Sequence, residues 1–205
     1  IVMSGTGEVS GAPDTVAVSI GVSVKRPNAP AAIGDAAASA KRLIDALRAA
    51  GVAEKDVQTT NYSISQEFRY PDSGPVPDGF RVSNQVVAKV RAVDKVGDVI
   101  DAATTAGGSD AVVSGVSFSL DDDEAALTDA RARAFEDAKR KAEQFAKASG
   151  RKLGKVVSVT QTDVVSPPVT SPLAYAAADQ RAATPIEAGE VQTAVTVEVR
   201  WSFAG

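Results

Sequence analysis

The stretch SLDDDEAALTDARARAFEDAKRKAEQFAKASGRKLG, residues 119–154, predicts one long amphipathic helix. Its apolar residues recur every three or four positions, which is the spacing of one buried helix face. They are Leu127, Ala130, Ala134, Ala138, Ala142, Phe145 and Ala146. On the opposite face, acidic residues precede basic ones by four positions, an order that stabilises a helix by about 0.2–0.5 kcal/mol per pair. We expect the helix to end at Gly150.

Four consecutive acidic residues, Asp121–Glu124, open this helix, and they suggest either a metal site or a helix start. A calcium-binding loop needs ligands at alternating positions and a glycine at its sharp turn, and this run has neither. Asp121 and Glu124 have the spacing of a capping box, and carboxylates in the first turn favour the helix dipole. We therefore interpret the run as a helix start with Asp121 as the N-cap, and we predict no metal site.

Segments of alternating apolar residues on both sides of the helix predict β-strands. They cover residues 15–24, 57–68, 80–92, 111–120, 155–162 and 191–201. A second helix should begin after Asn28 and end at Gly51, and a third should begin after Asp94 and end at Gly107. The resulting order, β-α-β-β-α-β-α-β-β, predicts an α+β fold in which helices pack on a mainly antiparallel sheet.

We expect residues 1–205 to form a single domain with a lead-in over residues 1–13 and two long loops, 69–79 and 166–189. Both loops are rich in residues that interrupt regular structure. The lead-in contains Gly5, Gly7 and Gly11. These glycines precede a strand and no Lys-Ser/Thr pair follows them, so a flexible lead-in is favoured over a phosphate-binding loop.

The composition excludes several kinds of chemistry. The 205 residues include no cysteine and no histidine, which excludes disulfides, Ser-His-Asp triads and the usual zinc ligands. The net charge of −4 arises from interspersed acids and bases, so nucleic acid is not an expected partner. No apolar run approaches the length of a membrane span. The sequence thus predicts no cofactor, and the given chain contains no transmembrane segment.

An enzyme that uses carboxylates or lysines is the least favoured class. Glu67, Asp72 and Asp78 lie near the expected loop 69–79, where acidic side chains are usually solvated. Lys41 and Lys89 are conceivable bases, but no catalytic motif surrounds either residue. We therefore predict no catalytic residues.

Four aromatic residues flank the segment Tyr70–Gly79 and form the candidate interaction patch. They are Tyr62, Phe68, Tyr70 and Phe80. Two interpretations remain open at this point: the four side chains form an apolar contact surface, or they pack against the base of the loop.

The order of several segments along the chain resembles the SIMPL-domain family. The segments are GTGEVSGAPD, AAGVAEKDVQTTNYSISQEF, FRVSNQVVAKVRAVDKVGDVIDAATTAGGSDAVVSGVSFSLDD, ARARAFEDAKRKAEQFAKASGRKLGKVVSV and PIEAGEVQTAVTVEVRWSF. Together they span nearly the whole chain. The loop 166–189 departs most from the family pattern.

The resemblance implies an exported bacterial protein of the oxidative-stress-defence or periplasmic immunogenic type. Such proteins lie in the periplasm or cell envelope, lipid-anchored or secreted, and some assemble into large oligomers. The resemblance leaves open a removed signal peptide or lipid anchor ahead of Ile1, and it supplies no catalytic motif. We expect a non-enzymatic envelope protein that acts by homo-oligomerisation or by binding an envelope partner. The alternative is a small-ligand or peptide-binding module.

Overall fold

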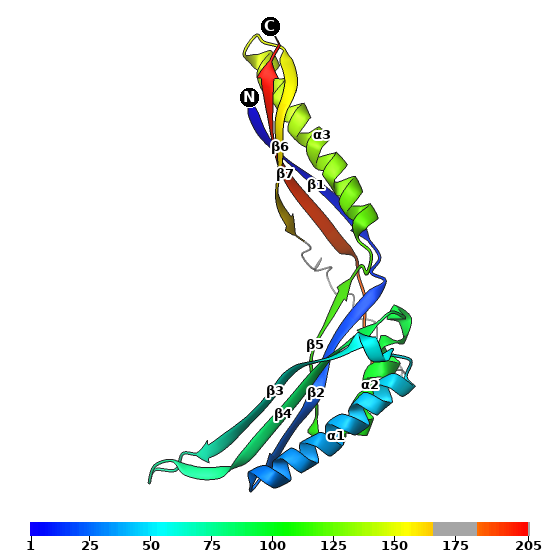
Figure 1. Ribbon diagram of the computed structural model, residues 1–205, viewed down its shortest axis with the longest axis vertical. Coiled ribbons are helices and arrows are strands. Elements are labelled where there is room, and N and C mark those ends of the chain that lie inside the picture. Colours follow the sequence, from blue (N-terminus) through cyan, green and yellow to red (C-terminus); the bar gives the residue numbers. More distant parts are fainter. Residues whose placement is uncertain (166–183, 205) are drawn as a thin grey trace. The chain divides into compact units, whose positions relative to one another are not determined.

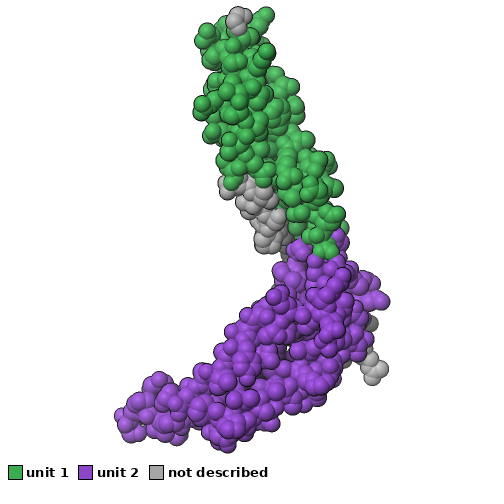
Figure 2. All heavy atoms as spheres, viewed as in Figure 1, with its two compact units in different colours: residues 1–13, 120–173, 189–205 green, residues 14–119, 174–188 purple. Residues whose placement is uncertain are grey.

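The computed structural model describes residues 1–165 and 184–204. The chain divides into two compact units (Figure 2). Unit 1 comprises residues 1–13, 120–173 and 189–205, and unit 2 comprises residues 14–119 and 174–188. The expected loop 166–189 lies mostly outside the described residues. That the whole chain acts as a single domain stays a prediction.

Unit 1 is a three-stranded antiparallel sheet with one long helix on it (Figure 1). The sheet has the order β1-β7-β6, formed by Val2–Gly11, Val191–Phe203 and Leu153–Val165. Helix α3, Glu124–Ala148, packs against it. The predicted strand at 191–201 is confirmed, because every second residue from Val191 to Trp201 is buried.

Strand β1 corrects the expected lead-in over residues 1–13. Its glycines allow α3 to approach the sheet, since a Cβ on Gly7 would lie 2.1 Å from the backbone oxygen of Ala130. A Cβ on Gly5 would lie at the same 2.1 Å from the backbone oxygen of Ala134. The facing helix residues are small as well, because α3 buries an alanine at every fourth position from Ala130 to Ala146. Strand and helix therefore pack almost backbone to backbone.

Two details of the predicted helix 119–154 were wrong. Phe145, expected in the buried face, is 58% exposed, and the fully buried residues of the helix are its alanines, with Leu127 and Phe135 partly buried beside them. Asp121 is not the N-cap, because the helix begins at Glu124 and the N-cap position is Asp123, whose side chain makes no capping hydrogen bond. Asp122 instead accepts a hydrogen bond from the Glu124 backbone N–H at 3.2 Å.

Unit 2 is a four-stranded antiparallel sheet with two helices packed on one face (Figure 1). Its strand order is β3-β4-β2-β5, formed by Val57–Arg69, Val76–Val90, Thr15–Arg26 and Ala111–Ser119. The helices are α1, Ala29–Ala49, and α2, Val96–Gly107. Short 3-10 turns cover Glu54–Asp56, Val93–Lys95 and Gly108–Asp110. The core consists mainly of valines from β2 and β4 against alanines and leucines of α1.

The ends of α1 follow the sequence prediction. The Asn28 side chain accepts a hydrogen bond from the Ala31 N–H at 2.9 Å, and Gly51 has the positive φ of 97° that terminates many helices. The start of α2 does not follow it, because Lys95 rather than Asp94 occupies the N-cap position and no side chain caps it.

The expected loop 69–79 is mostly a β-hairpin. Strand β3 continues to Arg69 and β4 begins at Val76, with Arg69 paired to Val76 and Phe68 paired to Pro77. Only residues 70–75 lie outside the strands. The α+β fold class and the predicted order of elements are confirmed, and β1 precedes them as an additional strand.

Candidate functional site

The four aromatic residues of the candidate patch lie on the β3–β4 hairpin. Tyr62 and Phe68 belong to β3, Tyr70 to the turn and Phe80 to β4. Tyr62, Phe68 and Tyr70 are 53%, 44% and 76% exposed. Phe80 is partly buried and packs against the core of unit 2. The packing interpretation therefore describes Phe80, while the other three side chains remain available for contacts.

Two exposed aliphatic residues of the hairpin were not included in the predicted patch. Ile64 on β3 is 46% exposed and Val76 on β4 is 38% exposed. Ile64 pairs with Val82 and Tyr62 pairs with Asn84 across the hairpin. Directly paired residues share a sheet face, so Tyr62 and Ile64 lie on the face that carries the helices. Alternation in the sequence indicates this shared face, but it does not reveal that the helices leave it uncovered at β3.

An ion-pair network ties the hairpin to β2. Arg81 donates to both Glu67 carboxylate oxygens, at 2.6 and 3.0 Å, and to the Ser23 hydroxyl at 3.2 Å. Lys25 donates to Asp78 at 2.6 Å and lies 3.8 Å from Glu67. Hydrogen bonding from Arg81 lowers the pKa of Glu67, and hydrogen bonding from Lys25 lowers the pKa of Asp78.

This network argues against acid catalysis on the hairpin. A carboxylic acid that donates a proton near neutral pH needs a raised pKa, usually obtained by burial or by a second carboxylate. Glu67 and Asp78 come together around Lys25, but the pKa of each carboxyl is lowered and each bonds a cation. Asp72 is exposed in the turn, and Lys41 pairs with Asp45 at 2.6 Å. The described residues contain no cluster of three or more acidic side chains suited to a metal ion.

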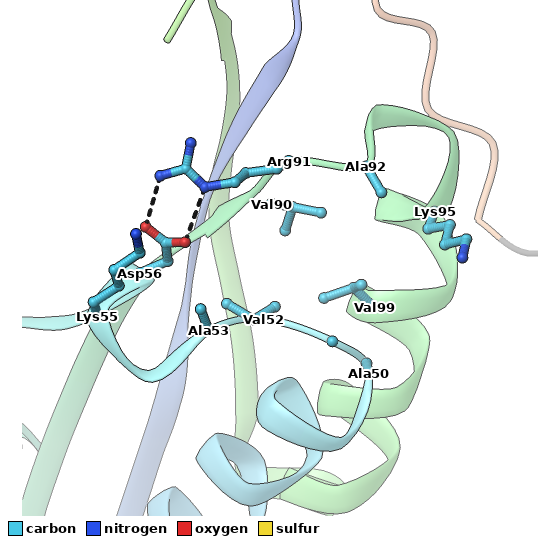
Figure 3. A pocket seen from close by; sticks show the side chains of 11 residues that line it. Ala50, Val52, Ala53, Lys55, Asp56, Val90, Arg91, Ala92, Lys95 and Val99 are labelled. Carbon is cyan, nitrogen blue, oxygen red and sulfur yellow. Dashed lines mark hydrogen bonds and ion pairs between the residues drawn. The ribbon is translucent and has the colours of Figure 1, made fainter.

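A small cavity of about 330 Å³ lies elsewhere in unit 2 (Figure 3). Val52, Val90 and Val99 form its apolar part, and Lys55 and Lys95 also line it. On one side, Arg91 donates two hydrogen bonds of 3.1 Å to Asp56, whose side chain is only 8% exposed. The hydrogen bond from Arg91 lowers the pKa of Asp56. The cavity thus combines an apolar interior with two lysines and a neutral ion pair, and sequence reasoning did not identify it.

No helix in the described part of the chain combines the length and the apolar character needed to cross a membrane.

Known proteins similar to this chain include periplasmic ones. The 26 kDa periplasmic immunogenic proteins of Brucella melitensis and Brucella abortus are each 30% identical over 97% of this chain and 82% of their own length. The uncharacterized protein YggE of Escherichia coli is 30% identical over 78% of this chain and 64% of its own length. The SIMPL family, described as a protein of unknown function (DUF541), matches residues 1–201. The chain therefore belongs to the SIMPL family.

Proposed function

We propose that this protein is an exported, non-enzymatic envelope protein that works through contacts, by self-association or by binding an envelope partner. The observation that carries the proposal is the set of exposed apolar side chains on the hairpin, Tyr62, Ile64, Phe68, Tyr70 and Val76. Exposed apolar side chains gathered on one element are typical of interaction surfaces. Aromatic residues are enriched in such surfaces because they bury a large area at a small entropic cost.

The proposed compartment is the periplasm or the cell envelope, with the protein either lipid-anchored or secreted. The support is that similar proteins of Brucella are named periplasmic. The link to oxidative-stress defence that the family resemblance implies would then act through contacts rather than through chemistry. The lowered pKa values of Glu67 and Asp78 support this, because a lowered pKa makes each carboxyl a poorer general acid and a weaker base than an ordinary one.

Sedimentation velocity over a range of concentrations tests the proposal. We expect the wild type to associate and the triple variant Tyr62→Ser, Ile64→Ser, Tyr70→Ser to remain monomeric under the same conditions. Phe145→Ser is the matched control, because Phe145 is similarly exposed but lies on α3. A wild type that stays monomeric, binds no envelope protein and turns over substrate in a broad hydrolase and peroxidase screen would refute the proposal.

A second candidate function, small-ligand binding, is favoured by the cavity shown in Figure 3. Its valines suit an apolar group, and Lys55 and Lys95, on opposite sides of the cavity, add positive charge at its rim. The ligand class would be a short amphipathic anion, with hexanoate as the probe and hexanol as the uncharged control. Saturable NMR shifts at the cavity with hexanoate, lost in the variant Lys55→Glu, Lys95→Glu, would support it. Unchanged spectra at millimolar hexanoate would exclude it.

A further inference from the structure

Strand β3 presents an edge without charges or prolines over its first ten residues, and its two register shifts leave residues 61–66 regular between them. Among the described strands, β3 pairs with β4 alone, and eleven of its 13 residues are exposed. Ten consecutive residues, VQTTNYSISQ over 57–66, contain no charge and no proline. Natural sheet edges are commonly blocked by lysines, prolines, bulges or covering elements, because free backbone groups pair with other chains.

The edge strands of unit 1 show such protection. On β1, Arg133 donates to the Glu8 carbonyl at 2.7 Å and Lys141 donates to the Ser4 carbonyl at 3.2 Å. The Thr6 N–H donates to Asp137 at 3.2 Å. Side chains of α3 therefore occupy backbone groups that another strand would need. Strand β6 is interrupted by three register shifts, and bulges of this kind protect an edge.

Strand β5 is the opposite edge of the same sheet as β3, and its nine residues are also uncharged. Its pairing with β2 is irregular near its centre, where Gly115 and Val113 face consecutive residues of β2. The difference lies in the adjacent side chains. Strand β5 exposes Val112 and Val113 at 40% each, but these two are consecutive, so they lie on opposite faces beside the register shift. Tyr62 and Ile64 on β3 are 53% and 46% exposed and share the helix-bearing face, so pairing at β3 would bury an aromatic and a branched residue together. This makes β3 the favoured edge and β5 the control.

The regular part of β3 is complementary to itself. Residues 61–66 lie between two register shifts and pair with β4 without interruption. Tyr62 and Ile64 lie on the helix-bearing face, while Asn61, Ser63 and Ser65 lie on the open face. Two copies of this strand can pair antiparallel about a two-fold axis that passes through Ser63 and is normal to the sheet. This rotation places the helix-bearing face of one copy beside that of the other, and the open face beside the open face. Tyr62 then faces Ile64 of a second copy, Asn61 faces Ser65, and Ser63 faces Ser63.

We propose that two copies of this chain pair antiparallel through β3, with the two-fold axis at Ser63, to form one continuous eight-stranded sheet. The inference rests on the proposed self-association and adds its site, partner and register. Opposed aromatic and β-branched side chains stabilise antiparallel pairs, and no like charges face each other within residues 61–66. A single strand pair is a small interface, so the dimer is weak and depends on concentration.

Cysteine cross-linking tests the register directly, since the chain has no native cysteine. In the proposed dimer the two Ser63 side chains are directly opposite, so Ser63→Cys should form a disulfide-linked dimer under mild oxidation. Ser117→Cys is the matched control, because Ser117 is an exposed serine on β5. Pairing raises the effective thiol concentration toward millimolar, so the Ser63→Cys dimer should form roughly tenfold faster or more. Equal rates for the two variants overturn the inference.

Charge substitutions give a second readout by sedimentation. Ser63→Lys alone and Ser63→Glu alone should each weaken dimerisation about fourfold at low salt, because like charges about 5 Å apart repel in water. An equimolar mixture of the two should dimerise more tightly than either alone, while Ser117→Lys should match the wild type. Circular dichroism confirms that each variant is folded. If the wild type associates but both Ser63 variants behave like Ser117→Lys, self-association stands and the β3 pairing fails. A wild type that stays monomeric at every concentration overturns both.

Discussion

Replacing Gly7 with alanine tests the close packing of β1 on α3. A Cβ at this position would lie 2.1 Å from the Ala130 backbone oxygen and 2.5 Å from the Ala134 backbone nitrogen. Contacts of this kind normally exceed 3 Å, so the helix or the strand must move by about 1 Å. Neither clashing atom belongs to a side chain that can rotate away. Overpacking of a rigid core costs about 1–3 kcal/mol, and we expect Gly7→Ala to reach at least about 3 kcal/mol.

Urea denaturation followed by tryptophan fluorescence is the assay for this change. Trp201 is the only tryptophan of the chain, and it is buried in the core of unit 1 with its ring centroid 6.2 Å from that of Phe135. Its emission therefore reports the unit in which the substitution lies. The expected result is a lower midpoint without a large change in the denaturant dependence of the unfolding free energy.

Gly11→Ala is the matched control on the same strand. No atom lies within 4 Å of a Cβ built on Gly11, so this substitution should change the unfolding free energy by less than about 0.5 kcal/mol. Shortening the facing side chains of α3 should not restore the stability lost in Gly7→Ala, because the nearest obstacles are backbone atoms. Equal midpoints for Gly7→Ala and Gly11→Ala would show that β1 and α3 do not pack as described.

Three further outcomes follow from local contacts. Asn28→Ala should lower the free energy of unfolding, measured by thermal denaturation, by about 0.5–2 kcal/mol, because it removes the N-cap of α1. Asn28→Asp should stay close to the wild type, and equal losses of stability in both variants would argue against the cap. The pKa of Glu67 is lower in the folded protein than in the unfolded chain, so the ionised Glu67 stabilises the fold at pH values above the unfolded pKa. This stability is lost as the pH falls through the folded pKa. Arg81→Gln should therefore reduce the loss of stability below about pH 4, which urea midpoints at several pH values would measure. Phe145→Ser should change stability by less than about 0.5 kcal/mol, and a larger loss in urea would mean that this ring is buried.

Most secondary structure was predictable because its signals are local. The alternation from Val191 to Trp201 requires one buried face wherever the strand lies, and the structure has that face buried. The cap at Asn28 and the stop at Gly51 depend on a few neighbouring residues, and both were found. The errors were at positions where local signals compete. In the acidic run several residues suit a helix start, and the structure begins α3 at Glu124 rather than after Asp121.

The candidate site was only partly predictable. Tyr62, Phe68 and Tyr70 are exposed on the hairpin, while Phe80 joins the core. The four residues look alike in the sequence, since each is an aromatic beside a turn-rich segment. Which of them is buried depends on the part of the sheet that α1 covers, and α1 packs over β2 and β4 rather than over β3. Ile64 was left out of the predicted patch for the same reason.

The sequence by itself determined the α+β class, the order of the predicted elements and the absence of thiol and imidazole chemistry, because periodicity and composition are properties of the chain alone. Only the tertiary structure decided the role of Gly5 and Gly7. Their lack of a side chain has meaning only once α3, more than 100 residues later, lies against them. The tertiary structure also decided which edges are protected, because the groups that cover β1 belong to Arg133, Asp137 and Lys141 on that distant helix. Such contacts join residues far apart in the chain, and no local pattern encodes them.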